Sequence, residues 1–211
     1  MKFSNIEGKK IVLDIIYAIQ ENRDYLSEID GAIGDGDHGI NMNKGATLAL
    51  PEVEEAKNLT DSLGILAKVL MNKIGGSMGP LYGSIFMGMQ EATLNKDQID
   101  GEVIRDMLNI AYENIQMISN AKPNDKTLVD VLDPSINTYN QIYDESKDVV
   151  KALNACSEAG KQGMLSTINM QAKLGRASRL GEKSIGHQDA GATSCYIIIN
   201  TFCNTSISLL K

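Results

Sequence analysis

The stretch Ile104-Arg-Asp-Met-Leu-Asn-Ile-Ala-Tyr-Glu-Asn-Ile-Gln-Met-Ile118 has the apolar spacing of one helix face. Its apolar side chains recur in steps of three and four residues, namely Ile104, Met107, Leu108, Ala111, Ile115 and Ile118. Residues at these steps lie on one side of an α-helix, because the helix has about 3.6 residues per turn. The stretch therefore predicts an amphipathic helix that packs on a core.

The same spacing recurs along the chain. It predicts helices around residues 12–19, 63–74 and 149–164, and shorter ones over 41–50, 80–94 and 128–143. Thr60 or Asp61 is expected to cap the second of these, and Pro134 to interrupt the last. The run Cys195–Cys203 is rich in β-branched residues, which favour a strand. No other segment supplies a partner strand, so we expect a buried helix there, and an all-α single domain of about eight helices over residues 1–211.

Composition excludes several classes of protein. The net charge of −7 and the pI of about 4.9 argue against a nucleic-acid partner, since nucleic-acid binders have a basic surplus. Three cysteines without a CxxC pair argue against a disulfide framework or structural zinc. The chain shows no signal peptide and no apolar run that could span a bilayer, so we expect a cytoplasmic protein without a membrane partner.

Glycine-rich polar stretches fall between the expected helices. They are Gly31–Gly39, Gly75–Pro80, Pro123–Thr127 and Gly175–Gly191. If the helices run up and down, alternate loops lie at the same end of the bundle. Several polar loops would then converge on one site without disturbing the core.

Three aspartates stand out in and directly before the first of these stretches. Asp30, Asp35 and Asp37 lie in a segment with no lysine or arginine between Arg23 and Lys44. Asp-Gly pairs commonly make turns, but three neighbouring carboxylates repel one another unless a cation is present. Carboxylate oxygens suit Mg²⁺, which usually also meets substrate phosphates.

Two other phosphate or metal motifs do not fit this segment. In an EF-hand counted from Asp35, position twelve would be Ala46 rather than glutamate. The Gly34–Gly39 match to GxGxxG follows a helical pattern rather than a strand, and its aspartates would repel a bare pyrophosphate. A phosphate at this segment would therefore be held through metal ions.

Further candidates lie near the aspartates or in the other loops. His38 is expected to contact a phosphate or another ligand, and Asn41 to start the next helix as its N-cap or to offer its N–H to an anion. Ser77 lies in an open loop before a helix that starts at Pro80. The basic segment Lys173–Arg179 is as well explained by a solvated face as by a phosphate clamp.

Four motifs in order resemble the L subunits of dihydroxyacetone kinases, which bind the nucleotide. The motifs are DGDHGINM at 35–42, GGSMGPLYG at 75–83, NDKTLVDVLDP at 124–134 and MQAKLGRASRLGEKSIGHQDAGATS at 170–194. The resemblance covers nearly the whole chain. It implies a barrel of eight antiparallel helices with the nucleotide at one end.

The resemblance also implies roles for individual residues. The three metal ligands would be Asp30, Asp35 and Asp37, which would hold two Mg²⁺ ions bridging the phosphates of ADP or ATP. The nucleotide contacts implied are His38, Gly39, Ile40, Asn41, Ser77, Met78, Ala121, Leu128, Arg176, Asp189, Ala190 and Gly191. Met78, Ala121 and Ala190 depart from the family's usual residues, and leave open a paralogue for another small ketose or aldose.

A free-standing chain of this kind resembles the bacterial system driven by phosphoenolpyruvate. The resemblance implies a K-type subunit that binds dihydroxyacetone and an M-type phosphohistidine subunit that rephosphorylates the bound ADP. The chain itself would need no covalent nucleophile, because phosphoryl transfer depends on positioning and charge neutralisation. The alternative is a non-catalytic nucleotide sensor that signals to a transcription regulator, since the same fold and site would serve both.

Overall fold

Nine α-helices make up most of the chain in the computed structural model, which describes residues 1–211. They are α1 (Asn5–Glu21), α2 (Arg23–Ile33), α3 (His38–Glu55), α4 (Leu59–Lys73), α5 (Met78–Thr93), α6 (Gly101–Ile118), α7 (Val129–Ser146), α8 (Val149–Ser166) and α9 (Ala190–Leu209). Two short 3₁₀ helices, η1 (Thr167–Asn169) and η2 (Arg176–Ser184), lie between α8 and α9. The prediction of an all-α fold is confirmed.

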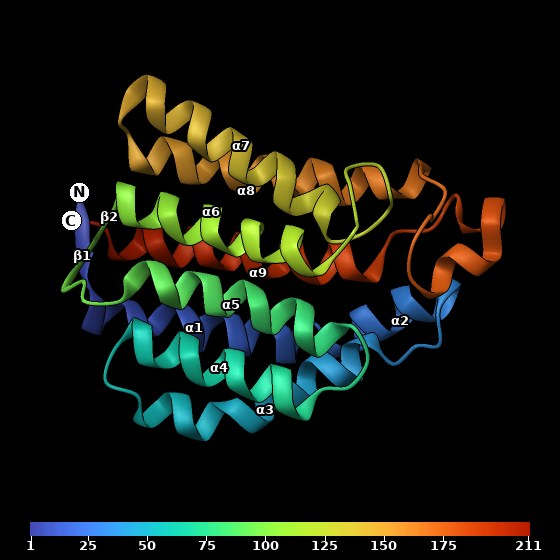
Figure 1. The fold of residues 1–211 in the computed structure, drawn as a ribbon, viewed down its shortest axis with the longest axis horizontal. Coiled ribbons are helices and arrows are strands. Elements are labelled where there is room, and N and C mark those ends of the chain that lie inside the picture. Colours follow the sequence, from blue (N-terminus) through green and yellow to red (C-terminus); the bar gives the residue numbers. More distant parts are fainter.

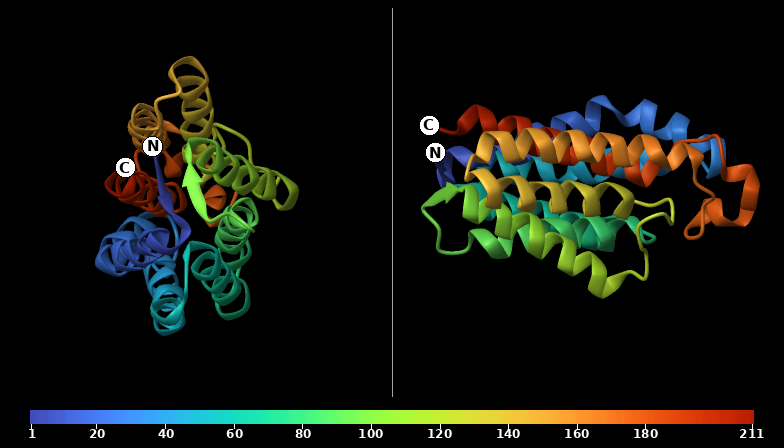
Figure 2. Two further views of the ribbon diagram at one scale, coloured as in Figure 1. Left: turned by 90° about the vertical axis from the view of Figure 1, so that its left-hand side faces the viewer. Right: turned by 90° about the horizontal axis from the view of Figure 1, so that it is seen from above.

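Eight of the helices close into a ring. Each packs on the next in the order α1, α3, α4, α5, α6, α7, α8 and α9, and α9 packs back on α1 (Figures 1 and 2). The ninth, α2, lies at one end of the ring against α3 and α9. The connections α4–α5, α6–α7 and α8–α9 lie at this same end, so the predicted convergence of alternate loops is confirmed.

Both chain termini lie at the opposite end, where two short strands form a sheet that the sequence analysis did not predict. β1 (Lys2–Ser4) pairs antiparallel with β2 (Gln98–Asp100), and Phe3 faces Ile99 in the register. The backbones of Lys2 and Lys211 exchange two hydrogen bonds beside it. Three residues are too few for an alternating pattern to be recognised in a sequence.

Several helix boundaries differ from the prediction. Asn58, rather than Thr60 or Asp61, caps α4, because its side-chain oxygen accepts a hydrogen bond of 2.8 Å from the Asp61 N–H. α7 continues through Pro134 to Ser146 instead of being interrupted. The proline lies in the second turn, where it removes a single backbone donor and the rest of the helix continues on its packing contacts with α8.

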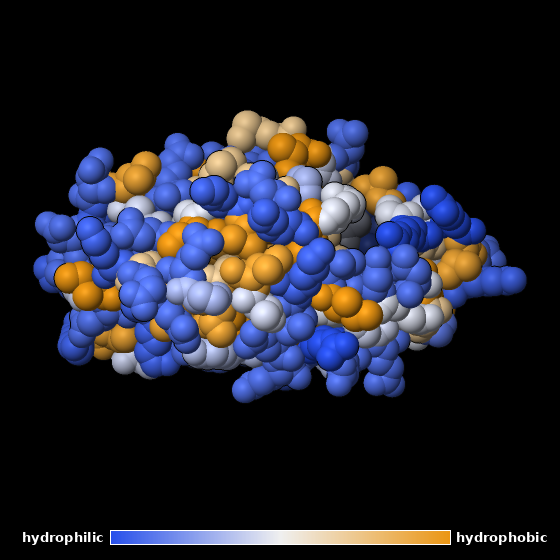
Figure 3. Space-filling view, turned by 90° about the horizontal axis from the view of Figure 1, so that it is seen from below, coloured by the Kyte–Doolittle hydropathy of each residue, from blue (hydrophilic) through white to orange (hydrophobic).

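The C-terminal run is a buried helix, as predicted. In α9, both the β-branched Ile198 and Ile199 and the larger Phe202 are buried in the main core. Tertiary packing here outweighs the strand propensity of the isoleucines. No helix of the chain has the length and apolar content needed to cross a bilayer. On the face shown in Figure 3, apolar side chains form separate areas among hydrophilic ones.

Candidate functional site

The three aspartates converge at the end of the ring where the loops meet. Asp30 lies in the last turn of α2, Asp35 in the turn that follows, and Asp37 at the residue before α3. One carboxylate oxygen from each lies within 4.8 Å of the others. No helix was predicted over residues 23–33, but α2 extends to Ile33, and Leu26, Ile29 and Ile33 do have helical spacing.

Two glycines allow the chain to bring these carboxylates together. A Cβ atom on Gly34 would lie only 2.3 Å from an Asp30 side-chain oxygen, so a larger residue would displace that carboxylate. Gly36 has a φ of +76°, in the left-handed region that glycine adopts without strain. The Asp-Gly pairs thus do form a turn, and the turn gathers three carboxylates.

Arg176 already offsets part of this negative charge. Its guanidinium forms an ion pair with Asp35 and lies 3.5 Å from an Asp37 oxygen. The sequence analysis placed Arg176 at the phosphates of a nucleotide, whereas here it contacts the proposed metal ligands. All these groups are partly exposed, so the ion pairs are screened by solvent and a competing cation could replace the arginine.

His38 is buried next to the aspartates. Its backbone N–H donates to Asp30 at 3.3 Å, and its Nε2 lies 2.7 Å from the Ser194 hydroxyl on α9. Burial lowers the pKa of His38 to about 4, against the opposing effect of the Asp30 charge. The imidazole is therefore neutral at neutral pH, and any contact with a phosphate would be a hydrogen bond rather than an ion pair.

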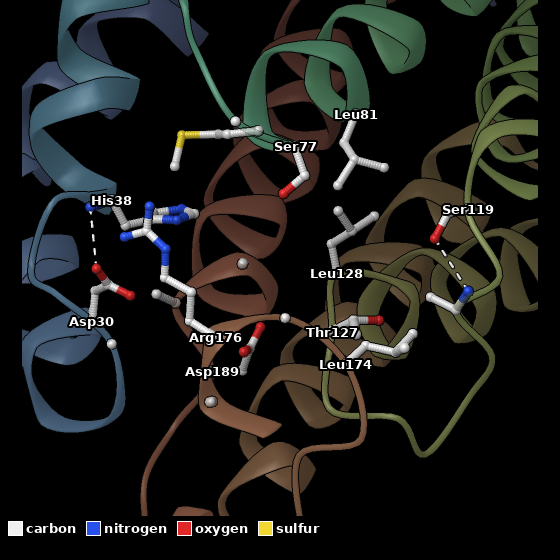
Figure 4. A pocket seen from close by; sticks show the side chains of 18 of the residues that line it. Asp30, His38, Ser77, Leu81, Ser119, Thr127, Leu128, Leu174, Arg176 and Asp189 are labelled. Carbon is white, nitrogen blue, oxygen red and sulfur yellow. Dashed lines mark hydrogen bonds between the residues drawn. The ribbon is translucent and has the colours of Figure 1, made fainter. Parts of the chain in front are cut away.

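A cavity of about 720 Å³ opens between these loops. Asp30, His38 and Arg176 lie on one side of it, and Leu81, Leu128 and Leu174 on the other (Figure 4). This volume is within the range of small-molecule sites, which are about 300–1,000 Å³. The cavity thus offers a charged region and an apolar region, as an anion with an apolar or aromatic part would require.

Most residues singled out from the sequence line this cavity. Those lining it are Asp30, Asp35, Asp37, His38, Asn41, Ser77, Met78, Ala121, Leu128, Arg176, Asp189, Ala190 and Gly191. Gly39 and Ile40 do not. A Cβ on Gly39 would lie 1.9 Å from the Arg23 carbonyl oxygen, so this glycine allows α3 to pack on α2, and Ile40 points to solvent with 50% exposure.

Two helix starts differ from those predicted at the cavity. α3 begins at His38, so Asn41 lies within its first turn and is not its N-cap. α5 begins at Met78, with Ser77 in the capping position, so Pro80 is its third residue rather than its first. The first N–H groups of both helices have no partner within the helix, which is the usual basis for anion binding at a helix start.

Lys126, which was not predicted as a functional residue, is only 1% exposed. Its Nζ donates hydrogen bonds to the carbonyl oxygens of Met170, Ser184 and His187, at 3.1, 2.6 and 2.6 Å. Burial lowers its pKa, while the charge of Asp189 raises it. Lys126 thus fastens the segment containing Arg176 to the α6–α7 loop. In the sequence, the one sign of its importance is its position within the motif at 124–134.

Asp189 caps α9 at the floor of the cavity. Its carboxylate accepts a hydrogen bond of 2.7 Å from the Ala192 N–H. Burial raises the pKa of Asp189 to about 6, although the Ala192 hydrogen bond and the Lys126 charge both act to lower it. Ionising this carboxyl group therefore costs the folded state more than the unfolded chain.

A pH dependence of stability follows. The pKa of Asp189 is about 6 in the folded state and 3.8 in the unfolded chain, so the folded state holds the proton more tightly. The contribution of Asp189 to the free energy of unfolding is therefore present below pH 3.8 and is lost as the pH rises from 3.8 to about 6. The loss is at most about 3 kcal/mol, because each unit of difference between the two pKa values corresponds to about 1.4 kcal/mol. Between pH 4 and pH 7, the free energy of unfolding measured in urea should rise for Asp189→Asn relative to the original chain, because asparagine does not ionise. The helix cap itself should be kept, since asparagine caps a helix as well as aspartate. A difference that stays constant over this range would refute the assignment.

Comparisons with known proteins identify relatives over most of the chain. The DAK2 domain family model matches residues 32–204. The chain is 37% identical over 193 residues to the ADP-binding subunit DhaL of PEP-dependent dihydroxyacetone kinase 1 from Listeria innocua, covering 90% of this chain and 91% of that one. It is 38% identical to the corresponding Escherichia coli subunit, covering 81% and 82%. It is 39% identical to that of the PTS-dependent kinase of Lactococcus lactis, covering 87% and 88%.

Solved structures share the fold. The dihydroxyacetone kinase of C. freundii superposes with a TM-score of 0.71 at 19% identity, over 93% of this chain. The same enzyme in complex with AMP-PNP and Mg²⁺ gives 0.68 over 97% of this chain. This chain spans about a third of that enzyme, covering 34% of its length. From the family match and the near full-length similarity to DhaL subunits, we conclude that the chain belongs to the DAK2 domain family and, within it, to the family of the DhaL subunits of dihydroxyacetone kinases.

Proposed function

We propose that residues 1–211 form one nucleotide-binding domain that acts in the cytoplasm as the L-type subunit of a phosphotransferase-system-dependent dihydroxyacetone kinase. The observation that carries the proposal is the convergence of three carboxylates at the charged end of a cavity whose other end is apolar. The near full-length similarity to ADP-binding subunits supports the same role.

The residues present suit the cations that this role needs. Asp30, Asp35 and Asp37 supply only oxygen ligands, and the Asp37 side chain, although it stands at the N-cap of α3, makes no capping hydrogen bond. Such a donor set fits Mg²⁺, and we propose that the three aspartates hold two ions. When bound, the ions neutralise phosphate charge and align the attacking and leaving oxygens.

The other groups around the cavity suit a bound ADP or ATP. The helix starts at Ser77–Met78 and Ala190–Gly191 offer backbone N–H groups to phosphate oxygens. Arg176, once released from the carboxylates, would offset the charge of the phosphates. Leu128 and Ala121 belong to the apolar end, where a base would be shielded from water. These residues bind and orient the nucleotide, which is most of what phosphoryl transfer requires.

The partners are proposed from the relatives, which are named as ADP-binding subunits of dihydroxyacetone kinases. We propose that a K-type subunit presents dihydroxyacetone to the nucleotide held in the cavity. An M-type phosphohistidine subunit would rephosphorylate the ADP in place. The exposed edge of the site, around Asp35 and Arg176, allows both to approach the phosphates.

Omission of single components tests this function. We expect the chain alone, with ATP and Mg²⁺, to form no dihydroxyacetone phosphate. Stoichiometric product should appear when a K-type subunit is added, and sustained turnover only with an M-type donor and a phosphoenolpyruvate supply. Product is measured in a coupled assay with each component left out in turn. Turnover by the purified chain alone would show a self-contained kinase instead of a subunit.

A further inference from the structure

A buried chain of hydrogen bonds joins the starts of three helices at the cavity. The Tyr82 hydroxyl on α5 lies 2.5 Å from Ser194 Oγ on α9, and that oxygen lies 2.7 Å from Nε2 of His38 on α3. Tyr82 also donates to the Gly191 carbonyl oxygen at 2.9 Å. All three side chains are buried. The connection therefore fixes α3, α5 and α9 relative to one another.

Each of these helix starts contributes to the proposed site. α3 follows directly on Asp35 and Asp37, α5 on Ser77, and α9 on Asp189. A shift of one helix start would move its cavity residues relative to those of the other two. Displacements of about 1 Å can cost roughly a hundredfold in rate when reacting groups must be aligned.

A count of the available protons orients the imidazole. The carbonyl oxygens of Gly191 and Ala190 can only accept, so the Tyr82 proton is shared between the Gly191 carbonyl oxygen and Ser194 Oγ, and Ser194 donates its own proton to Ala190, 3.0 Å away. Ser194 Oγ then also accepts from His38 Nε2–H. This arrangement accounts for four contacts with three protons and leaves Nδ1 of His38 unprotonated, as an acceptor. If Ser194 instead donated to Nε2, the Ala190 carbonyl would lose its side-chain donor.

We propose that Tyr82 and Ser194 are positioning residues for phosphoryl transfer, which act through His38 by fixing its place and its Nε2–H tautomer at the cavity. The inference rests on the proposed function. A neutral acceptor at this point suits a hydroxyl or water beside the phosphates rather than a phosphate oxygen, which is itself an acceptor. Another buried tyrosine differs: the Tyr139 hydroxyl donates at 2.9 Å to the Gly101 carbonyl at the far end of the ring.

Tyr82→Phe and Tyr139→Phe are matched variants that separate positioning from stability. Both remove one hydroxyl from a tyrosine that is at most 1% exposed. In the complete assay with both partner subunits, Tyr82→Phe should lower kcat about fivefold to tenfold, while KM for the substrate-loaded partner changes less than twofold. Tyr139→Phe should keep the original kcat even if its melting temperature falls as much.

The histidine tautomer gives a second, activity-independent measurement. The chain has two histidines, His38 and the exposed His187, so long-range ¹H–¹⁵N spectra of the imidazoles are simple to assign with a His187→Gln variant. We expect His38 to show a protonated Nε2 and an unprotonated Nδ1. In Ser194→Ala the acceptor for Nε2–H is gone, and the two nitrogens should move toward the averaged shifts of a free imidazole.

Original kcat in both Tyr82→Phe and Ser194→Ala, or an unchanged His38 spectrum in Ser194→Ala, would overturn the inference. If the original chain transfers no phosphoryl group with its partners, the proposed function fails, and the tautomer comparison still decides whether Ser194 orients His38. If Ser194→Ala does not fold, Tyr82→Phe in both measurements decides alone, with loss of kcat supporting the inference and original kcat refuting it.

Discussion

Replacement of Asp35 with alanine is expected to abolish phosphoryl transfer in the assembled kinase while the helical ring stays folded. Asp35 provides one of three carboxylates whose oxygens lie within 4.8 Å of one another. Loss of one ligand opens the coordination shell of a cation that must offset several phosphate charges. Because such a cation stabilises the transition state by several kcal/mol, the rate should fall by about a thousandfold or more. Asp30→Ala and Asp37→Ala should behave alike.

The fold should tolerate this change because Asp35 is exposed and interacts chiefly with Arg176. Losing that screened pair costs little, and one charge fewer also relieves repulsion between the remaining carboxylates. We therefore expect an unchanged or slightly raised melting temperature without metal. Activity, bound Mg²⁺ and circular dichroism should be measured on the same preparation, so that lost transfer can be separated from lost folding.

Asp24→Ala is the matched control. Asp24 lies on the same helix as Asp30, its side chain is 94% exposed and lies beside Arg23, and it does not line the cavity. This variant removes one negative charge from the same region of the chain, and should retain full activity and Mg²⁺ binding. Full activity of Asp35→Ala would refute the metal site, and equal losses in Asp24→Ala would point to a general charge effect instead.

The helices were predictable wherever apolar residues repeat over several turns, as in Ile104–Ile118. The prediction failed where this repeat is short or weak. α2 was missed although Leu26, Ile29 and Ile33 have helical spacing, because its eleven residues are short and run directly into the glycine-rich stretch. β1 has three residues and owes its conformation to pairing with β2, almost a hundred residues away in the chain, which no local pattern indicates.

At the site, residue type and spacing identified side chains but not the direction in which each one points. His38, Gly39, Ile40 and Asn41 are consecutive, and successive residues of a helix point about 100° apart. His38 and Asn41 therefore share the cavity side, whereas Gly39 faces the backbone of α2 and Ile40 faces solvent. Knowing that α3 begins at His38, instead of Asn41, would have separated these two pairs.

Lys126 could not be predicted because its partners are backbone carbonyl oxygens, which leave no trace in the residue types. The carbonyl oxygens of Met170, Ser184 and His187 reach Lys126 only because of the path that the α8–α9 segment takes.

These three hydrogen bonds are the basis of the second prediction with a large expected effect. Lys126→Met keeps the volume of the side-chain stem. It should nevertheless lower the free energy of unfolding by about 2–4 kcal/mol, because three largely buried carbonyl oxygens lose their hydrogen-bond donor.

Lys173→Met is the control that separates this role from loss of a positive charge near the site. Lys173 lies on the segment that Lys126 fastens, but its side chain is 59% exposed and pairs with Asp125 at 3.1 Å. Such a surface pair contributes about 1 kcal/mol or less. Urea unfolding should therefore give a much lower free energy of unfolding for Lys126→Met than for Lys173→Met. Hydrogen exchange should show faster opening of residues 170–187 in Lys126→Met alone, because three anchors of the segment with Arg176 are lost. Equal stability and equal exchange in the two variants would mean that the buried lysine does not hold this segment in place.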